Sequence, residues 1–306
     1  MARIFRRNLI FKEVFSISSN IQWFPGHMAK ALHQFQNNVH LADIIFELVD
    51  ARCPYSSINP EIRKIGRGKP HLLILTKADL ADTEMTQSWV RWFRLHGYAA
   101  TSVDSKNNLT SNQITKIAQQ ILKSKINSDH AKGIANKTIR AICVGVPNVG
   151  KSTLLNQIIK RRAAQVGNRP GITKGQQWLK SSRNLELLDT PGILWPRFQN
   201  ESIAYKLALT GAIKDNLYPK DDVALFAIDF FRNHAEQNLA KRYRLTGDDL
   251  KLSRVDLLMK ITKNAGMLQD FNRGSMRIIL DARRGKLGNF TLDELSIAKS
   301  GLDNDN

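Results

Sequence analysis

The first two thirds of the chain alternate short apolar runs with segments of helical periodicity. Apolar runs at residues 43–50, 71–75, 98–103 and 138–144 predict buried strands, and shorter runs at 176–180 and 185–188 predict two more. The intervening spacing predicts helices at residues 31–40, 59–65, 84–96, 113–125 and 153–160. Strands that alternate with helices predict an α/β fold, a mostly parallel sheet with helices on both faces.

The pattern changes after residue 200, where helical periods dominate. They predict helices at 201–213, 221–244, 247–264 and 270–284, and one strand-like apolar run lies at 224–228. We therefore expect three parts: a basic N-terminal extension (1–20), an α/β domain (21–198) and a small, mostly helical domain (199–306).

The net charge of the chain and its distribution predict the kind of partner that the protein binds. The 306 residues carry 46 Lys or Arg and 27 Asp or Glu, a net charge of +19. Residues 123–184 hold thirteen of the basic residues and a single acid, whereas residues 201–306 are nearly balanced. This excess is more than one bound triphosphate requires, so nucleic acid is the expected partner.

Apolar run lengths, cysteine spacing and N-terminal composition indicate the compartment in which the protein works. No apolar run approaches the roughly 18 residues that a membrane span needs, and the two cysteines, Cys53 and Cys143, have no metal spacing, which favours a reducing compartment. The acid-poor, basic residues 1–20 resemble an organellar transit segment, but a short basic arm fits them equally.

Residues 145–153 (GVPNVGKST) match the phosphate-loop pattern, between a predicted strand and a predicted helix. In that context backbone N–H groups and the positive helix end face an anion, Lys151 reaches the β- and γ-phosphates, and Ser152 can bind Mg²⁺. We expect this loop to bind a nucleoside triphosphate through Asn148, Val149, Gly150, Lys151, Ser152 and Thr153.

A second motif, Thr76-Lys77-Ala78-Asp79, follows the apolar strand at 71–75 and resembles the guanine-reading pattern N-K-x-D. The Asp79 carboxylate can accept hydrogen bonds from guanine N1–H and the exocyclic amine, and adenine would leave it unpaired. Lys77 would pack its stem along the base. Asp104 and Ser105, after the next strand, fit the loop that completes a guanine pocket.

A third motif, Asp189-Thr190-Pro191-Gly192, ends the strand at 185–188 and matches D-x-x-G. Asp189 would reach Mg²⁺ through water, and the Gly192 N–H would approach the γ-phosphate. Thr173, in a basic Gly/Pro-rich loop, is the candidate second hydroxyl on Mg²⁺. The guanine-reading motifs precede the phosphate motifs, which is the reverse of the order in small GTPases, so a circularly permuted GTPase is expected. In this order the γ-phosphate-sensing segment runs directly into the helical domain.

These strings resemble the ribosome biogenesis GTPase A (RbgA/YlqF) family of circularly permuted GTPases. The similar segments are residues 21–30 (IQWFPGHMAK), 50–52 (DAR), 76–79, 145–153, 169–173 (RPGIT), 187–196 (LLDTPGILWP), 210–215 (TGAIKD) and 284–290 (RGKLGNF). The resemblance implies a GTPase that assists late assembly of the large ribosomal subunit. Its C-terminal domain would bind rRNA, its partners would be the subunit precursor and ribosomal proteins, and it would act as a monomer.

The same resemblance singles out four positions for hydrolysis and binding. Thr76 stands where the family usually has Asn, which removes an amide that ties the guanine loop to the phosphate loop, so weaker nucleotide binding is expected. Ile193 replaces the water-orienting Gln of Ras-type enzymes. Asn148 resembles the Asn of K⁺-using GTPases, and His27 matches a histidine proposed to act in hydrolysis. Together with Lys151 and Thr173, Asn148 and His27 are the candidate catalytic residues.

Alternatives remain for mechanism and location. A GTP-regulated RNA-binding scaffold with incidental hydrolysis would share these motifs, and an ATPase or kinase would share the phosphate loop alone. The internal strings favour the bacterial cytoplasm, and the N-terminal segment favours the mitochondrial matrix.

Overall fold

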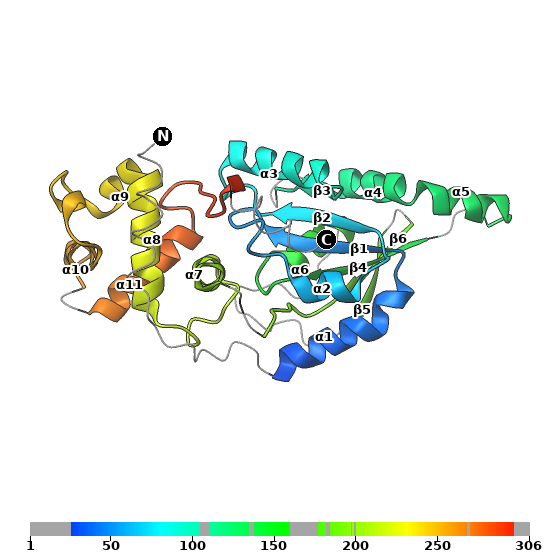
Figure 1. Ribbon diagram of the computed structural model, residues 1–306, viewed down its shortest axis with the longest axis horizontal. Coiled ribbons are helices and arrows are strands. Elements are labelled where there is room, and N and C mark those ends of the chain that lie inside the picture. Colours follow the sequence, from blue (N-terminus) through cyan, green and yellow to red (C-terminus); the bar gives the residue numbers. More distant parts are fainter. Residues whose placement is uncertain are drawn as a thin grey trace.

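The computed structural model describes residues 26–104, 110–134, 138–159, 177–181, 184–196, 198, 200–267 and 270–296. Six strands form one sheet in the order β3-β2-β1-β4-β6-β5 (Figure 1). They are β1 (Ile44–Asp50), β2 (His71–Thr76), β3 (Ala99–Ser102), β4 (Ile139–Gly145), β5 (Gln177–Ser181) and β6 (Leu185–Asp189). All neighbours are parallel except β5 and β6, which are antiparallel. The predicted α/β class and strand positions are confirmed.

The strand register brings the three sequence motifs to one edge of the sheet. Thr76 is paired with Asp50, Leu48 with Gly145, and Cys143 with Asp189. The carboxyl ends of four parallel strands therefore lie side by side, as they do around ligands in open α/β sheets. The central pair β1 and β4 joins the two halves of the permuted domain.

Helices cover both faces of the sheet, as predicted. One face packs against α1 (Gly26–Asn38), α2 (Pro60–Ile65) and α3 (Thr83–Leu95), and the other against α4 (Thr110–Ile121) and α6 (Lys151–Ile159). The central strands are buried on both sides: every residue of β1 is buried. This burial explains why the strands read as continuous apolar runs and not as alternating patterns.

Side-chain caps fix where several helices begin. Asn59 caps α2 and Asp82 caps α3, each accepting a hydrogen bond from a first-turn N–H. Asn200, Ser253 and Asp270 cap three further helices of the C-terminal region in the same way. Each cap satisfies a backbone donor that has no partner inside its helix.

Two long predicted helices are each divided. The segment predicted at 113–125 belongs to α4 and to α5 (Lys123–Ala131), which projects beyond the sheet (Figure 1). The segment predicted at 221–244 is α8 (Lys220–His234) followed by α9 (Glu236–Tyr243). The strand-like run at 224–228 lies inside α8, where three of its residues are buried, so its apolar character reflects helix burial and not a strand.

The C-terminal helices form a lobe at one end of the molecule (Figure 1). It contains α7 (Glu201–Thr210), α8, α9, α10 (Arg254–Asn264) and α11 (Phe271–Arg283), with α8 packed against α7, α10 and α11. We call these helices the helical lobe. Its hydrophobic core is continuous with the sheet core, since Leu207 and Ile228 belong to the same buried cluster as Ile44 and Leu155.

The chain returns to the sheet domain after α11. The backbone N–H of Phe290 donates to Leu80 O (3.3 Å) and that of Leu292 to Arg52 O (2.7 Å). The Asp293 carboxylate accepts from the Ser56 amide (2.8 Å) and hydroxyl (2.6 Å). A domain limit at residue 198 remains a prediction, and residues 291–293 of the predicted helical domain contact residues 51–56.

Some predicted features lie outside the described residues: the 1–20 extension, Ser105 and Thr173. The helices in the described part of the chain are all too short or too polar to span a membrane. Both cysteines are buried and free.

Candidate nucleotide-binding site

The phosphate loop connects β4 to α6 in a conformation that its glycines require. A Cβ at Gly145 would lie 2.5 Å from the Leu48 carbonyl oxygen, and Gly150 has φ +103°. Asn148 also has a positive φ, 55°, a conformation that Asn adopts more readily than most residues. Lys151 begins α6 and is buried. The predicted strand, loop and helix N-terminus are thus in place, with Ser152 and Thr153 half-buried in the first turn.

The D-x-x-G segment lies against this loop. A Cβ at Gly192 would lie 2.6 Å from Pro147 Cα, so only glycine allows the two backbones to approach so closely. The Ile193 N–H donates to Gly145 O (3.0 Å). The Asn59 side-chain amide donates to Ile193 O (3.1 Å). The backbone that follows Gly192 is therefore held from both halves of the chain.

The charges beside the phosphate loop fit a divalent cation. Both carboxylate oxygens of Asp189 are buried and make no hydrogen bond of normal geometry to the described residues. Burial raises the pKa of Asp189, and the Lys151 ammonium and the nearby Thr190 N–H only partly offset this. Burial also lowers the pKa of Lys151. A buried carboxylate with unused lone pairs beside a phosphate loop is the type of oxygen ligand that Mg²⁺ prefers, in an octahedron that water and phosphate oxygens would complete.

Thr76 corrects one expectation. Its hydroxyl lies 2.5 Å from Val149 O of the phosphate loop and 3.0 Å from Val49 O. The tie between the guanine loop and the phosphate loop is therefore not lost with the Asn: a shorter side chain makes it from the end of β2. Weaker nucleotide binding stays a prediction, without its original reason.

The guanine loop adopts a constrained turn after β2. Lys77 has φ 56° and Asp79 is half-buried, followed by a backbone bond from Leu80 N–H to Lys77 O (3.0 Å). The Ala78 N–H donates to Val103 O (3.4 Å), which places the loop beside Asp104. The expected neighbours Thr76, Lys77, Ala78, Asp79 and Asp104 are thus brought together.

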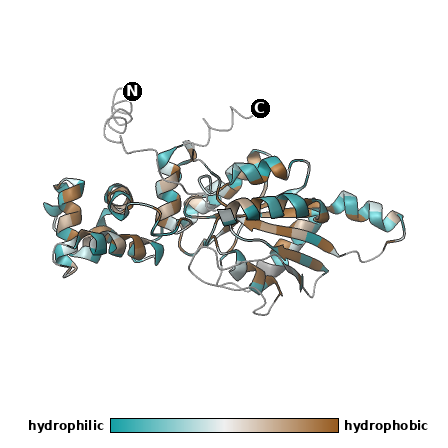
Figure 2. Ribbon diagram, turned by 90° about the horizontal axis from the view of Figure 1, so that it is seen from below, coloured by the Kyte–Doolittle hydropathy of each residue, from teal (hydrophilic) through white to brown (hydrophobic). Residues whose placement is uncertain are grey.

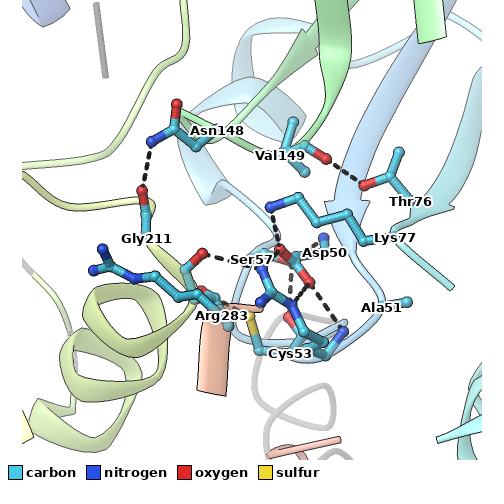
Figure 3. Close-up of polar contacts among 12 residues, drawn as sticks. Asp50, Ala51, Cys53, Ser57, Thr76, Lys77, Asn148, Val149, Gly211 and Arg283 are labelled. Carbon is cyan, nitrogen blue, oxygen red and sulfur yellow. Dashed lines mark hydrogen bonds and ion pairs between the residues drawn. The ribbon is translucent and has the colours of Figure 1, made fainter. Parts of the chain in front are cut away.

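Asp50 and Arg52 lie directly behind this loop, and the sequence reasoning gave them no role. Asp50 Oδ2 accepts hydrogen bonds from Lys77 Nζ (2.9 Å) and Arg52 NH2 (2.7 Å) (Figure 3). Burial alone would raise the pKa of Asp50, but the two cations hold it well below its usual value. The DAR string of the family resemblance was the available signal for this cluster.

The carboxyl end of α7 was also missed, and it contacts three separate parts of the chain; Figure 3 shows the contact between Asn148 and Gly211. Arg283 donates to the carbonyls of Ala208 (2.7 Å) and Leu209 (3.1 Å). Arg52 donates to Thr210 O (3.0 Å), and the Asn148 amide donates to Gly211 O (2.8 Å). Carbonyls at the end of α7 thus accept hydrogen bonds from Arg52 beside the guanine loop, from Asn148 of the phosphate loop and from Arg283 of α11.

His27 lies at the start of α1 with its side chain exposed. Partial burial and the positive charge of Lys214 lower its pKa from 6.5. Lys214 belongs to the 210–215 string, so this histidine is electrostatically coupled to the segment that follows α7. Asp215 of the same string binds Arg283 (2.8 Å).

Comparisons with known proteins agree with this geometry. A family model described as 50S ribosome-binding GTPase matches residues 140–263. The chain is 43% identical over 278 residues to the ribosome biogenesis GTPase A of Bacillus cereus, covering 89% of this chain and 93% of the relative. The chain belongs to the ribosome biogenesis GTPase A family. It is also 31% identical to the mitochondrial ribosome-associated GTPase 1 of Mus musculus, with 89% and 90% covered.

Solved structures agree on the fold of this family. GNP-bound YlqF from T. maritima superposes with a TM-score of 0.60 at 24% identity, covering 87% of this chain and 98% of that one. Membership in the family makes the chain a GTPase that binds guanine nucleotides, with a circularly permuted P-loop domain followed by a helical region.

Proposed function

We propose that this ribosome biogenesis GTPase A family member is a GTP-hydrolysing assembly factor for the large ribosomal subunit, and that the subunit precursor stimulates its hydrolysis. The observation that carries the proposal is similarity over nearly the whole chain, helical lobe included, to proteins named for ribosome biogenesis. The description of the matching family as 50S ribosome-binding supports the large subunit.

In the proposed site the two halves of the permuted domain hold opposite ends of GTP. Asp79 accepts from the guanine edge, the Lys77 stem lies along the base, and Thr76, Ala78, Asp104 and Ser105 complete that pocket. Backbone N–H groups from Asn148 to Thr153 and the Lys151 ammonium bind the phosphates, and the Gly192 N–H approaches the γ-phosphate.

Mg²⁺ would be held by Ser152, Thr173 and, through water, Asp189. When bound, the ion would supply positive charge that neutralises the charge developing on the phosphates during hydrolysis. The buried, weakly bonded Asp189 oxygens support this assignment. K⁺ is a candidate second cation beside Asn148, whose amide nitrogen is already engaged by Gly211 O and whose oxygen would face the ion.

Hydrolysis needs a group other than residue 193 to orient water, because Ile193 is fully buried and apolar. We assign this role to His27. Its pKa is lowered from 6.5, so the imidazole is neutral at pH 7 and can accept a proton from water. Stimulated turnover should then fall as the pH drops below 6.5 through the pKa of His27. The His27→Ala variant should lose both stimulated turnover and this acid limb, and intact stimulation in it would exclude the role.

The proposed partner is RNA. The helical lobe and the basic 123–184 region would contact rRNA and ribosomal proteins, and the protein would act as a monomer. The net charge of +19 supports a polyanionic partner. The higher identity to bacterial relatives than to mitochondrial ones supports the bacterial cytoplasm over the mitochondrial matrix.

Two measurements test the function. Single-turnover GTP hydrolysis with and without large-subunit precursors should show a rate increase with the precursor, whereas the alternative scaffold would bind without acceleration. Co-sedimentation with ribosomal subunits should be stronger with GTP than with GDP. Equal affinity for ATP and GTP would overturn the assignment of Asp79.

A further inference from the structure

Asp50 and Arg52 have no assigned role in binding the nucleotide itself, yet they form the most deeply buried ion pair among the described residues, next to the proposed site. The side chain of Arg52 is 1% exposed and that of Asp50 is 4% exposed. Burying two charges costs free energy unless both are well bonded. Their contacts on either side indicate what this buried pair does.

On one side the pair reaches the guanine loop. Arg52 grips Asp50 with two bonds, from Nε to Oδ1 (2.9 Å) and from NH2 to Oδ2 (2.7 Å). The same Oδ2 accepts from Lys77 Nζ (2.9 Å). The Lys77 backbone is in the left-handed region, and this contact holds the ammonium at the other end of its side chain.

On the other side the pair reaches the helical lobe. Arg52 NH2 also donates to Thr210 O (3.0 Å), at the last residue of α7. The negative end of a helix favours a cation at this point. The Phe290 ring, from the segment that follows α11, lies 5.9 Å from the guanidinium carbon.

We propose that Asp50 and Arg52 are positioning residues that fix Lys77 for the guanine base and anchor it to the carboxyl end of α7. This proposal rests on the place given to Lys77 under the proposed function. A lysine stem has four rotatable bonds, so holding its ammonium presets the stem before the base arrives. A shift of α7 in the helical lobe then moves Arg52 and changes guanine affinity.

The arginine fork is essential to this arrangement. One guanidinium donates to both Asp50 oxygens and to a backbone carbonyl, and a lysine ammonium cannot do this with the same planar geometry. Arg52→Lys keeps the charge and the approximate size but loses the shared contact. It is the variant that separates geometry from charge.

The test is a double-mutant cycle on the affinity for fluorescent GDP, with Arg52→Lys, Lys77→Met and the double variant. Each single change should weaken binding about tenfold, the effect expected for one charge-assisted hydrogen bond. If Arg52 acts through Lys77, the double variant should be no weaker than the singles. We call the proposed route from α7 through Arg52 to Lys77 the relay. If the two losses of GDP affinity multiply to about a hundredfold in the double variant, the relay is overturned. An Arg52→Lys variant with unaltered GDP affinity would overturn it as well.

Arg63→Lys is the matched control. Arg63 pairs with Glu47 on the same strand (Nε to Oε2, 3.5 Å), away from Lys77, and this change should leave the GDP affinity unaltered. A tenfold loss of GDP affinity in the control would show that loosening any arginine paired with a β1 carboxylate has the effect, which would also overturn the proposal.

Two further variants keep the result interpretable. If Arg52→Lys does not fold, Lys77→Arg and Lys77→Met decide: Arg at 77 can still bind Asp50 and should bind GDP nearly normally, and equal losses in both would exclude the contact. Asp79→Asn distinguishes the two levels of the proposal. If it leaves the preference for GTP over ATP intact, the proposed guanine site itself fails. If it abolishes that preference while Arg52→Lys has no effect, only the relay fails.

Discussion

At the scale of single residues, Thr76 shows how one side chain replaces another without losing a contact. Its hydroxyl has a single proton and two carbonyl neighbours, Val149 O at 2.5 Å and Val49 O at 3.0 Å. The shorter of these contacts joins the guanine loop to the phosphate loop. This contact therefore ties together the two loops that hold opposite ends of GTP in the proposed site.

Replacing Thr76 by Val should weaken GDP binding about five- to tenfold, because Val keeps the shape and removes the donor, a loss of about 1 kcal/mol. Thr76→Ser keeps the hydroxyl and should bind nearly as the parent protein does. Isothermal titration with GDP measures both. A Ser variant as weak as the Val variant would show that the methyl group, and not the hydrogen bond, matters.

The motif that contains Thr76 could be predicted from the sequence, whereas the contacts of Arg52 could not. The guanine and phosphate motifs were placed correctly because each follows an apolar run, and parallel strands bring their carboxyl ends to one edge. The contacts of Arg52 with Thr210 and of Asn148 with Gly211 join residues 158 and 63 positions apart. No local pattern encodes such pairs, and they depend on how the helical lobe packs.

Asp189 carries a stability prediction with a definite sign. Its pKa is raised by burial, so the folded protein without a cation loses stability as the pH rises above the ordinary value of 3.8. Asp189→Asn should remove this pH dependence and raise the unfolding free energy of the nucleotide-free protein by about 1 kcal/mol. Mg²⁺ should add to the thermal stability of the GDP complex in the parent protein only. A Mg²⁺ increment that survives in the variant would exclude Asp189 from the metal site.

At the scale of elements, α5 differs from every other helix around the sheet. None of its residues is buried, and it projects from the domain as a hydrophilic helix (Figure 2). Lys125 forms an ion pair with Asp43, whereas Lys123 and Lys132 are exposed on the same projection. Ile126 is partly buried against the core, but a helix without a fully buried apolar stripe is stabilised little by the fold itself, which favours a role in binding.

Reversing two charges, Lys123→Glu with Lys132→Glu, should weaken binding to the subunit precursor. If both lysines contact phosphates, the slope of log affinity against log salt should fall by roughly 2. Nucleotide affinity should not change. The matched control reverses Lys64 and Arg67, which are exposed beside α2. Equal losses in both pairs would indicate a general charge effect and not an α5 contact.

At the scale of the whole molecule, the helical lobe and the sheet domain are joined by more than a shared apolar core. Asp293 links them: it accepts from Ser56 of the sheet domain and from Lys206 Nζ of α7 (2.9 Å). The Lys206 side chain is 9% exposed and that of Asp293 is 4% exposed. The two regions should therefore unfold as one cooperative unit, although the helical pattern begins abruptly after residue 200.

Removing one partner of this pair should be costly, because the other charge stays buried. Asp293→Ala is expected to lower the unfolding free energy by about 3–5 kcal/mol, and the apolar pair Lys206→Met with Asp293→Leu should recover most of that loss.

Urea unfolding, which measures these free energies, can follow both regions separately. The tryptophans of the described residues (89, 92, 178 and 195) precede the helical lobe, so their fluorescence reports the sheet domain, and far-UV circular dichroism includes the lobe. Coincident transitions in the parent protein are expected. Separate midpoints there would mean that the Asp293 contacts do not couple the two regions. In that case the interface between the helical lobe and the sheet domain would open independently of the nucleotide site, and the route proposed from α7 to the guanine loop would have to act across it.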